Sequence, residues 1–159
     1  METLLVGIVS LISTTVQGPI DEDLIHRTAQ RIAIEEGKSL TPYQDSDGLA
    51  VCHGAKAQSW DDIKTDQECW DMVVAAAELI LTFVDENIDK PLTDNQWISI
   101  ASFSYNVKNP ERLFQYINKD NPTDEEIAQE IRLYAYSNGV WLKGLSERRM
   151  REAELFLKP

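Results

Sequence analysis

Apolar side chains recur at helical spacing along most of the chain. Between Cys69 and Ile88 they follow one another at steps of three and four residues, which predicts a long amphipathic helix. The segment Thr65–Glu68 before it has the composition of a capping box, in which a threonine and a glutamate satisfy free N–H groups at a helix start. Similar boxes at Thr93–Gln96 and Thr123–Glu126 predict two further helices.

The remaining segments are shorter. An apolar pattern after Asp21 predicts a helix that ends at Gly37, because glycine commonly follows the last helical turn. Residues 111–117 fit a short helix, and Ser146 is expected to begin the last one, with Met150, Ala153 and Phe156 on one face. Residues 40–53 change to turn and strand chemistry and predict a small β-hairpin. The expected fold class is therefore mainly α (α+β).

Composition narrows the class of protein. The chain has 159 residues, of which 43% are hydrophobic and 26% charged, which is typical of one globular domain. Its net charge of −12 repels nucleic acid and anionic lipid, so we expect no nucleic-acid partner. The two histidines and two cysteines match no zinc spacing, and we expect neither a metal nor a cofactor.

Charge is distributed unevenly. Residues 1–140 hold 10 basic and 24 acidic groups, whereas residues 141–159 hold five basic and three acidic groups. The carboxyl-terminal excess fits either a solvated helix or a local positive patch for an anionic polymer.

The amino-terminal segment, residues 1–20, differs from the domain expected over residues 21–159. No charged residue occurs between Thr3 and Ile20, and Leu4 to Ile12 is almost wholly apolar. The run is short for a membrane-spanning helix, and Glu2 stands where a secretory signal carries a basic residue. Three interpretations of residues 4–16 stay open: an export or anchor segment, a docking segment for a partner such as a virion protein, and a packed amphipathic arm.

One pair of carboxylates stands out as candidate chemistry. Glu36 lies in the last turn of the first predicted helix, and Asp45 follows nine residues later in the turn of the hairpin. A helix end and a hairpin turn can meet at one edge of a cleft. Two carboxylates in different environments are what glycoside cleavage needs, since one protonates the leaving oxygen while the other acts on water or on the sugar. Asp47 is the second choice for that partner.

Several motifs around this pair occur together in a known family. Glu36-Gly37, Tyr43-Gln44-Asp45 with Gly48, and Val51-Cys52-His53-Gly54 resemble the catalytic stretch of the phage-type lysozymes, glycoside hydrolase family 24, especially the lambdoid endolysin branch. Further matches follow in the same order and cover about residues 30–157: Thr65–Cys69 resembles T-x-x-E-C, Ser102–Val107 resembles S-F-x-Y-N-V, and Lys143–Glu152 resembles K-G-L-x-x-R-R-x-x-E.

The resemblance implies a two-lobed fold, with a small β-hairpin lobe and a helical lobe on either side of a cleft. It implies hydrolysis of the β-1,4 bond between N-acetylmuramic acid and N-acetylglucosamine in peptidoglycan, by a monomeric phage-encoded enzyme. Such an enzyme acts in the host periplasm or at the cell wall, membrane-tethered or virion-associated. Glu36 matches the general acid and Asp45 the second carboxylate. Tyr43, Tyr105, Asn106 and Arg148 are candidate substrate-binding residues.

The hairpin departs from the family pattern. It is one residue shorter than D-x-x-G-x-x-T-V-C, and Ala50 stands where a threonine helps to hold the attacking water. Alanine has no hydroxyl to do so. Two alternatives to an active hydrolase follow: a catalytically impaired structural or wall-binding protein, and a lytic transglycosylase, which needs the acid but no positioned water.

The other motif residues have structural interpretations as well. Tyr105 and Asn106 also fit core packing and a helix cap, and Arg148 and Arg149 also fit solvated positions. Cys52 and Cys69 are more commonly small buried side chains, but an exported protein pairs such residues. The four tryptophans are expected mostly in the core, with one of them able to line a sugar cleft: Trp60, Trp70, Trp97 and Trp141.

Overall fold

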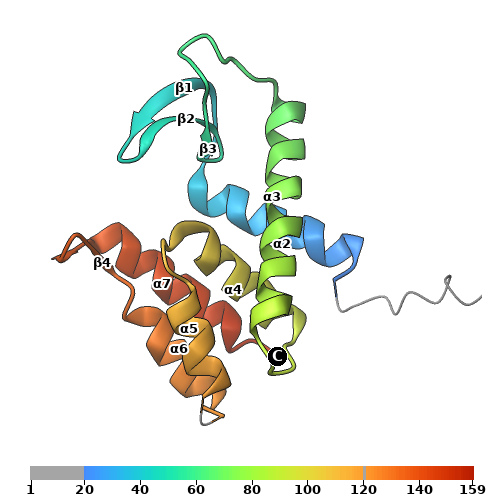
Figure 1. Cartoon of the computed structure of the whole chain (residues 1–159), viewed down its shortest axis with the longest axis vertical. Coiled ribbons are helices and arrows are strands. Elements are labelled where there is room, and N and C mark those ends of the chain that lie inside the picture. The colour runs from blue at the N-terminus through green and yellow to red at the C-terminus, as the bar shows by residue number, and fades with distance from the viewer. Residues whose placement is uncertain (1–19, 120) are drawn as a thin grey trace, which may run out of the picture.

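The computed structural model describes residues 20–119 and 121–159. This part of the chain holds two small antiparallel sheets and a set of helices (Figure 1). The elements are α2 (Glu22–Glu36), β1 (Ser39–Asp45), β2 (Gly48–Cys52), β3 (Ala55–Lys56), α3 (Asp66–Asn87), α4 (Asp94–Asn106), α5 (Glu111–Asn118), α6 (Asp124–Arg132), β4 (Tyr136–Ser137), β5 (Val140–Trp141) and α7 (Lys143–Phe156). The predicted mainly α, two-lobed fold with a small hairpin lobe is confirmed. The apolar segment of residues 4–16 lies outside the described residues.

All three predicted capping boxes are present. In the first, the backbone N–H of Glu68 donates to the Thr65 hydroxyl at 3.2 Å, and the Thr65 N–H donates to the Glu68 carboxylate at 2.7 Å. The same reciprocal bonds start α4 at Thr93 and α6 at Thr123. These starts were predictable because every partner lies within three residues.

The predicted start of the last helix is wrong. Helix α7 begins at Lys143, and the Ser146 N–H already donates to the carbonyl of Leu142 at 3.0 Å. Ser146 therefore lies inside the first turn. Met150 is half exposed, whereas the buried residues of α7 are Arg148, Arg149, Glu152, Ala153 and Phe156. Three of these five are charged, so a search for apolar positions places the buried face incorrectly.

Helix α4 is the centre of the helical lobe. Eight consecutive residues, Gln96–Phe103, are buried, since α2, α3 and α7 all pack against it. Trp97 is buried in this core as predicted. Trp60 and Trp141 are 61% and 51% exposed, so a core position was wrong for them.

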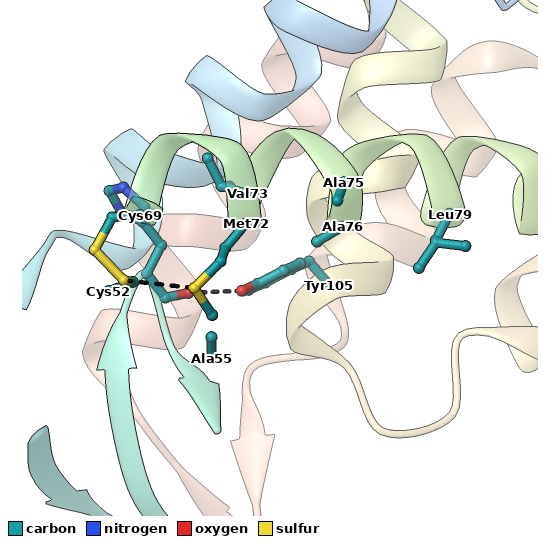
Figure 2. Close-up of a pocket in the computed structure, with 10 residues that line it drawn as sticks. Cys52, Ala55, Cys69, Met72, Val73, Ala75, Ala76, Leu79 and Tyr105 are labelled. Carbon is teal, nitrogen blue, oxygen red and sulfur yellow. Dashed lines mark hydrogen bonds between the residues drawn. A yellow bond between two sulfur atoms is a disulfide. The ribbon is translucent and has the colours of Figure 1, made fainter. Parts of the chain in front are cut away.

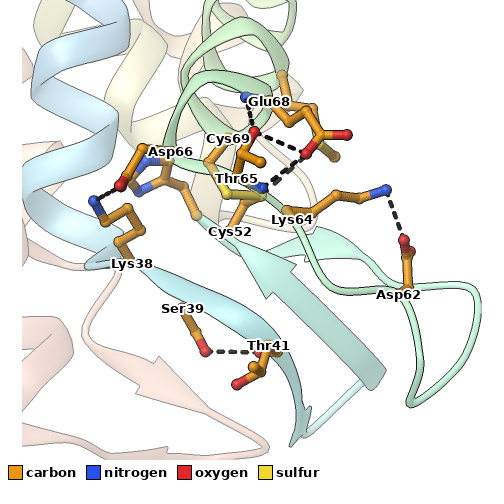
Figure 3. The surroundings of a disulfide bond; sticks show 12 residues. Lys38, Ser39, Thr41, Cys52, Asp62, Lys64, Thr65, Asp66, Glu68 and Cys69 are labelled. Carbon is orange, nitrogen blue, oxygen red and sulfur yellow. Dashed lines mark hydrogen bonds and ion pairs between the residues drawn. A yellow bond between two sulfur atoms is a disulfide. The ribbon is translucent and has the colours of Figure 1, made fainter.

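The sheet lobe is joined covalently to α3. Strands β1, β2 and β3 form an antiparallel sheet in that order, and a disulfide links Cys52 at the end of β2 to Cys69 in the first turn of α3 (Figure 3). An ion pair between Lys38 and Asp66 lies beside it. Of the two interpretations left open for these cysteines, separate buried side chains and a disulfide, the structure has the disulfide.

The second sheet was not predicted. Strands β4 and β5 have two residues each, joined by Asn138 and Gly139, both at positive φ. Asn-Gly is the strongest short signal for a two-residue hairpin turn, so the sequence did contain the information. Among the described residues, no helix is both long and apolar enough to cross a bilayer.

Candidate active site

A cleft of about 910 Å³ separates the sheet lobe from the helical lobe. Glu36 and the β1–β2 turn line it on one side, and the end of α4, the segment after it and the β4–β5 hairpin line it on the other. The predicted residues found in this lining are Glu36, Tyr43, Asp45, Tyr105 and Asn106, together with Asp47. The structure thus brings the two candidate carboxylates to one cavity.

Glu36 lies at the carboxyl end of α2 with 19% of its side chain exposed. Its Oε1 accepts a hydrogen bond from Arg148 at 2.6 Å. The other oxygen, Oε2, lies next to Gly54, where a Cβ would come within 3.7 Å of it. Gly54 has φ +82°, a conformation that favours glycine. One carboxylate oxygen is therefore fixed by a cation, while the other borders the cleft.

Asp45 occupies the turn that leads from β1 into β2. Its side chain is exposed, and Oδ1 accepts the backbone N–H of Asp47 at 2.7 Å, which stabilises the turn. Tyr43 lies two residues earlier and faces the cleft as well, because strand residues two apart share a face. Asp47 itself pairs with Lys108 at 3.2 Å across the cleft. This leaves Asp45 Oδ2 as the oxygen without a bond to the turn.

The charge of Glu36 affects the pKa values of two tyrosines. Burial raises the pKa of Tyr43, and the nearby charges of Asp45 and Glu36 raise it further. Burial and the charge of Glu36 raise the pKa of Tyr105 to about 12. Both phenols are therefore protonated at neutral pH. The Tyr105 hydroxyl donates to the carbonyl of His53 at 2.6 Å, which holds the strand end next to Gly54.

Arg148 is not a cleft residue. It is buried and donates to Glu36, to the carboxylate of Glu152 at 3.0 Å, and to the carbonyl of Ser102 at 3.1 Å. Arg149 is fully buried and donates to the side-chain oxygen of Asn106 at 2.9 Å. The solvated interpretation of both arginines is wrong, because each compensates buried charge.

Glu152 connects these two arginines and was missed as a functional candidate. Its side chain is fully buried, it accepts a hydrogen bond from Ser102 at 2.8 Å, and its second oxygen lies 3.0 Å from Arg149. Burial raises the pKa of Glu152, and the charges of Arg149 and Arg148 oppose that rise. The only sequence signal was its place at the end of the R-R-x-x-E segment.

Ala50 lies on the same face of the sheet as Tyr43, its cross-strand partner. Its side chain is 2% exposed and does not line the cleft. The position matched to the family threonine is thus covered by neighbouring residues rather than open to a substrate.

A second pocket, of about 290 Å³, shares Tyr105 with the cleft (Figure 2). It is lined mainly by apolar side chains of α3, among them Met72, Ala76 and Leu79, and by the disulfide. It contains no carboxylate, so the chemistry of acid and base belongs to the cleft. Within residues 20–119 and 121–159, no cluster of three His, Cys, Asp or Glu side chains is suited to a metal ion.

Comparison with known proteins agrees with this geometry. The family model described as "Phage lysozyme" matches residues 33–152. A SAR-endolysin of Pseudomonas phage phiKMV is 27% identical over 131 residues, which cover 78% of this chain and 82% of that protein. A SAR-endolysin of Escherichia phage N15 is 35% identical over 80 residues, 46% of this chain, and the match spans 45% of the relative's own length. An endolysin from Escherichia coli O157:H7 phage FAHEc1 has the same fold, with a TM-score of 0.74 at 22% identity, covering 89% of this chain and 96% of that one.

Proposed function

This chain belongs to the phage lysozyme family, and we propose that it hydrolyses the β-1,4 bond between N-acetylmuramic acid and N-acetylglucosamine in bacterial peptidoglycan. The observation that carries the proposal is the position of Glu36. Its carboxyl group borders the cleft, has one oxygen held by Arg148, and shares the cavity with Asp45. General-acid catalysis of glycoside cleavage requires such a group.

The two carboxylates have different roles in this proposal. Glu36 donates a proton from Oε2 to the glycosidic oxygen, because Oε1 is occupied by Arg148. Asp45, exposed and free at Oδ2, acts on a water molecule or on the sugar. Tyr43, Tyr105 and Asn106 line the path of the glycan, whereas Arg148 acts through Glu36 as a positioning residue.

The test is cleavage of purified peptidoglycan, with mass analysis of the products. Wild-type protein should release fragments with reducing muramic ends, and Glu36→Gln should lower the rate by about 10²–10⁴-fold with an unchanged circular dichroism spectrum. Anhydro ends would indicate the transglycosylase instead. Wall binding without cleavage would indicate the non-enzymatic alternative, which the missing hydroxyl at Ala50 and the net charge of −12 favour.

The proposed place of action is the bacterial cell wall, and the proposed origin is a phage genome. We assign residues 4–16, the uncharged apolar run, to membrane association or partner docking rather than to the lysozyme domain over residues 21–159. A chain beginning at Asp21 should remain folded and cleave purified peptidoglycan at the wild-type rate. Unfolding of that shortened chain would show that the segment belongs to the core.

A further inference from the structure

Large apolar side chains are concentrated around the β4–β5 hairpin. Five of the eleven large exposed hydrophobic residues in the described part of the chain lie within ten positions: Leu133, Tyr136, Val140, Trp141 and Leu142. Each is between 42% and 65% exposed. A gathering of this kind on a soluble domain is typical of an interaction site rather than of random surface.

The hairpin holds two aromatic side chains on one face. Tyr136 and Trp141 are cross-strand partners, as are Ser137 and Val140. Partners directly opposite in an antiparallel pair project to the same side, so Tyr136 and Trp141 form one face and Ser137 and Val140 form the other. The Leu142 N–H donates to the carbonyl of the buried Ala135 at 2.9 Å, which closes the base of the hairpin.

The aromatic face adjoins the cleft through Tyr136, whereas Trp141 lies outside the lining of the cavity. Tyr136, Ser137, Asn138 and Leu142 line the same cavity as Glu36 and Asp45. Figure 1 shows the hairpin projecting beyond the start of α7, on the side of the molecule that also carries the three-stranded sheet. A polymer in the cleft would reach the hairpin as it leaves the reacting carboxylates.

The chemistry of the hairpin fits a sugar. Between residues 133 and 146 there is no acidic side chain and one lysine, Lys143, in a chain with a net charge of −12. Aromatic rings present apolar faces to the C–H groups of a pyranose, and the Asn138 amide offers both a donor and an acceptor for hydroxyl and N-acetyl groups. A lipid surface fits less well, because it would also meet Asp45, Asp47 and Glu130 around the same cavity.

From this position beside the cleft we propose that the β4–β5 hairpin is an additional glycan-binding site. Tyr136 and Trp141 hold a saccharide segment of the same strand that lies outside the bond being cleaved. The inference rests on the proposed function, since it concerns the substrate of that cleft. In this proposal the hairpin helps the enzyme to hold long glycan strands and takes no part in the chemical step.

The consequence is a dependence on strand length. A short fragment that fills only the cleft between Glu36 and Asp45 does not gain from the hairpin, whereas a long strand does. Loss of the aromatic pair should therefore raise the apparent KM for intact peptidoglycan with kcat unchanged, because it removes binding that is equal in the ground state and the transition state.

The test compares two variants of the full chain that alter opposite faces of the hairpin. Tyr136→Ala/Trp141→Ala removes the aromatic face, and Val140→Ala removes a side chain of similar exposure, 60%, from the opposite face. Each is measured for cleavage of sacculi, and for co-sedimentation with sacculi in the Glu36→Gln background, in which cleavage is slow enough for binding to be measured alone. Titration of the same background with a hexamer of N-acetylglucosamine and with vesicles of anionic phospholipid separates sugar from lipid.

We expect the double variant to bind sacculi and hexamer about tenfold more weakly, as the loss of exposed aromatic anchors commonly does, while Val140→Ala stays within twofold of its parent. Equal binding by the double variant and by Val140→Ala would overturn the inference. So would a loss of vesicle binding without a loss of hexamer binding. Absence of cleavage by the wild-type chain would instead contradict the proposed function. Co-sedimentation measures binding without cleavage, so it tests the hairpin independently of that outcome.

Discussion

The guanidinium group of Arg148 lies between Glu36 and Glu152. It donates to Oε1 of Glu36 at 2.6 Å and to Oε1 of Glu152 at 3.0 Å. The contact joins the end of α2 to α7, 112 residues further along the chain. Arg148 is buried in this position, so water cannot easily replace either carboxylate as its partner.

We predict that Glu152 positions the proposed general acid through Arg148. Glu152→Gln removes one of the two carboxylates that hold Arg148, so the guanidinium is held less firmly against Oε1 of Glu36. Because this bond orients the proposed proton donor for the transition state, kcat should fall while KM stays unchanged. The turnover number should fall roughly ten- to a hundredfold.

The measurement is kcat and KM on purified peptidoglycan, with circular dichroism to confirm folding. Glu154→Gln, an exposed neighbour on α7, is the control and should keep the wild-type values. Glu152→Asp keeps the charge that holds Arg148 and should recover part of the lost turnover. A Glu152→Gln variant with lower stability but wild-type kcat would mean that Glu152 serves stability alone.

Glu35, the neighbour of Glu36, provides a pH-dependent contribution to stability. Burial alone would raise the pKa of Glu35, but its bonds to Arg151 and Arg31 lower it below the ordinary value of 4.5. A lowered pKa in the folded state means that stabilisation is complete above pH 4.5 and is lost as the pH falls through the folded pKa. Acid should therefore weaken the α2–α7 contact.

The corresponding variant is Glu35→Gln. Its free energy of unfolding at pH 7 should fall by about 1–3 kcal/mol, and the difference from wild type should shrink below pH 4.5. Urea denaturation at several pH values measures both effects. Glu78→Gln on the exposed side of α3 is the control, and a difference that stays constant with pH would contradict the assignment.

These contacts show which parts of the molecule the sequence could predict. The capping boxes at Thr65, Thr93 and Thr123 were predictable because they are local. Glu36 and Asp45 were found through motif spacing, and the cleft that joins them required the packing of two lobes. The burial of Arg149 and Glu152 was not identifiable, since a hydrophobic pattern treats charged residues as surface, and Asn106 and Ser102, which bond to them, lie on α4.

Two further features, the second sheet and the disulfide, were also not predictable from the sequence pattern, although the residues involved lie close together in the chain. Strands of two residues, as in β4 and β5, are too short for an alternating pattern, so only the Asn138-Gly139 turn marks them. The pairing of Cys52 with Cys69 depends on β2 ending beside the first turn of α3, which spacing alone does not determine.

The disulfide should contribute most of the independent stability of the sheet lobe. It joins residues 17 positions apart, for which restriction of the unfolded chain corresponds to about 3 kcal/mol. The free energy of unfolding of Cys52→Ala/Cys69→Ala should therefore be lower by about 3 kcal/mol, so this variant unfolds at a lower denaturant concentration. Adding dithiothreitol should lower the stability of the wild type to that of the double variant and leave the variant unchanged. Equal stability of the wild type and the variant without reductant would show that the disulfide does not stabilise the fold.

Gly54 should be sensitive to the smallest substitution. Gly54→Ala places a methyl group 3.7 Å from Oε2 of Glu36 and forces alanine to φ +82°. We expect about 1–2 kcal/mol of destabilisation from the backbone and a loss of cleavage, because the methyl group fills the approach to the proton-donating oxygen. Gly139→Ala, at φ +77° in open space, reports the backbone cost alone in urea denaturation. Full activity of Gly54→Ala would place the reacting oxygen elsewhere.

Ala50 allows a test of how the attacking water is held. Its side chain is covered and has Tyr43 as its cross-strand neighbour. A hydroxyl added by Ala50→Ser is therefore buried on the sheet rather than presented to the cleft. We expect no gain in turnover on sacculi, and a loss of up to about 1–3 kcal/mol of stability where the hydroxyl finds no partner.

The reason for this expectation is the bonding of Asp45. Its Oδ1 is bonded within the turn, and Oδ2 borders the cleft without needing help from position 50. Asp45→Asn should accordingly lower turnover far more than either Ala50→Ser or Ala50→Thr changes it. A severalfold increase in the cleavage rate of Ala50→Thr would show that the hydroxyl does reach the water. In that case the shortened turn opens during the reaction, and the covered position of Ala50 describes only the enzyme without substrate.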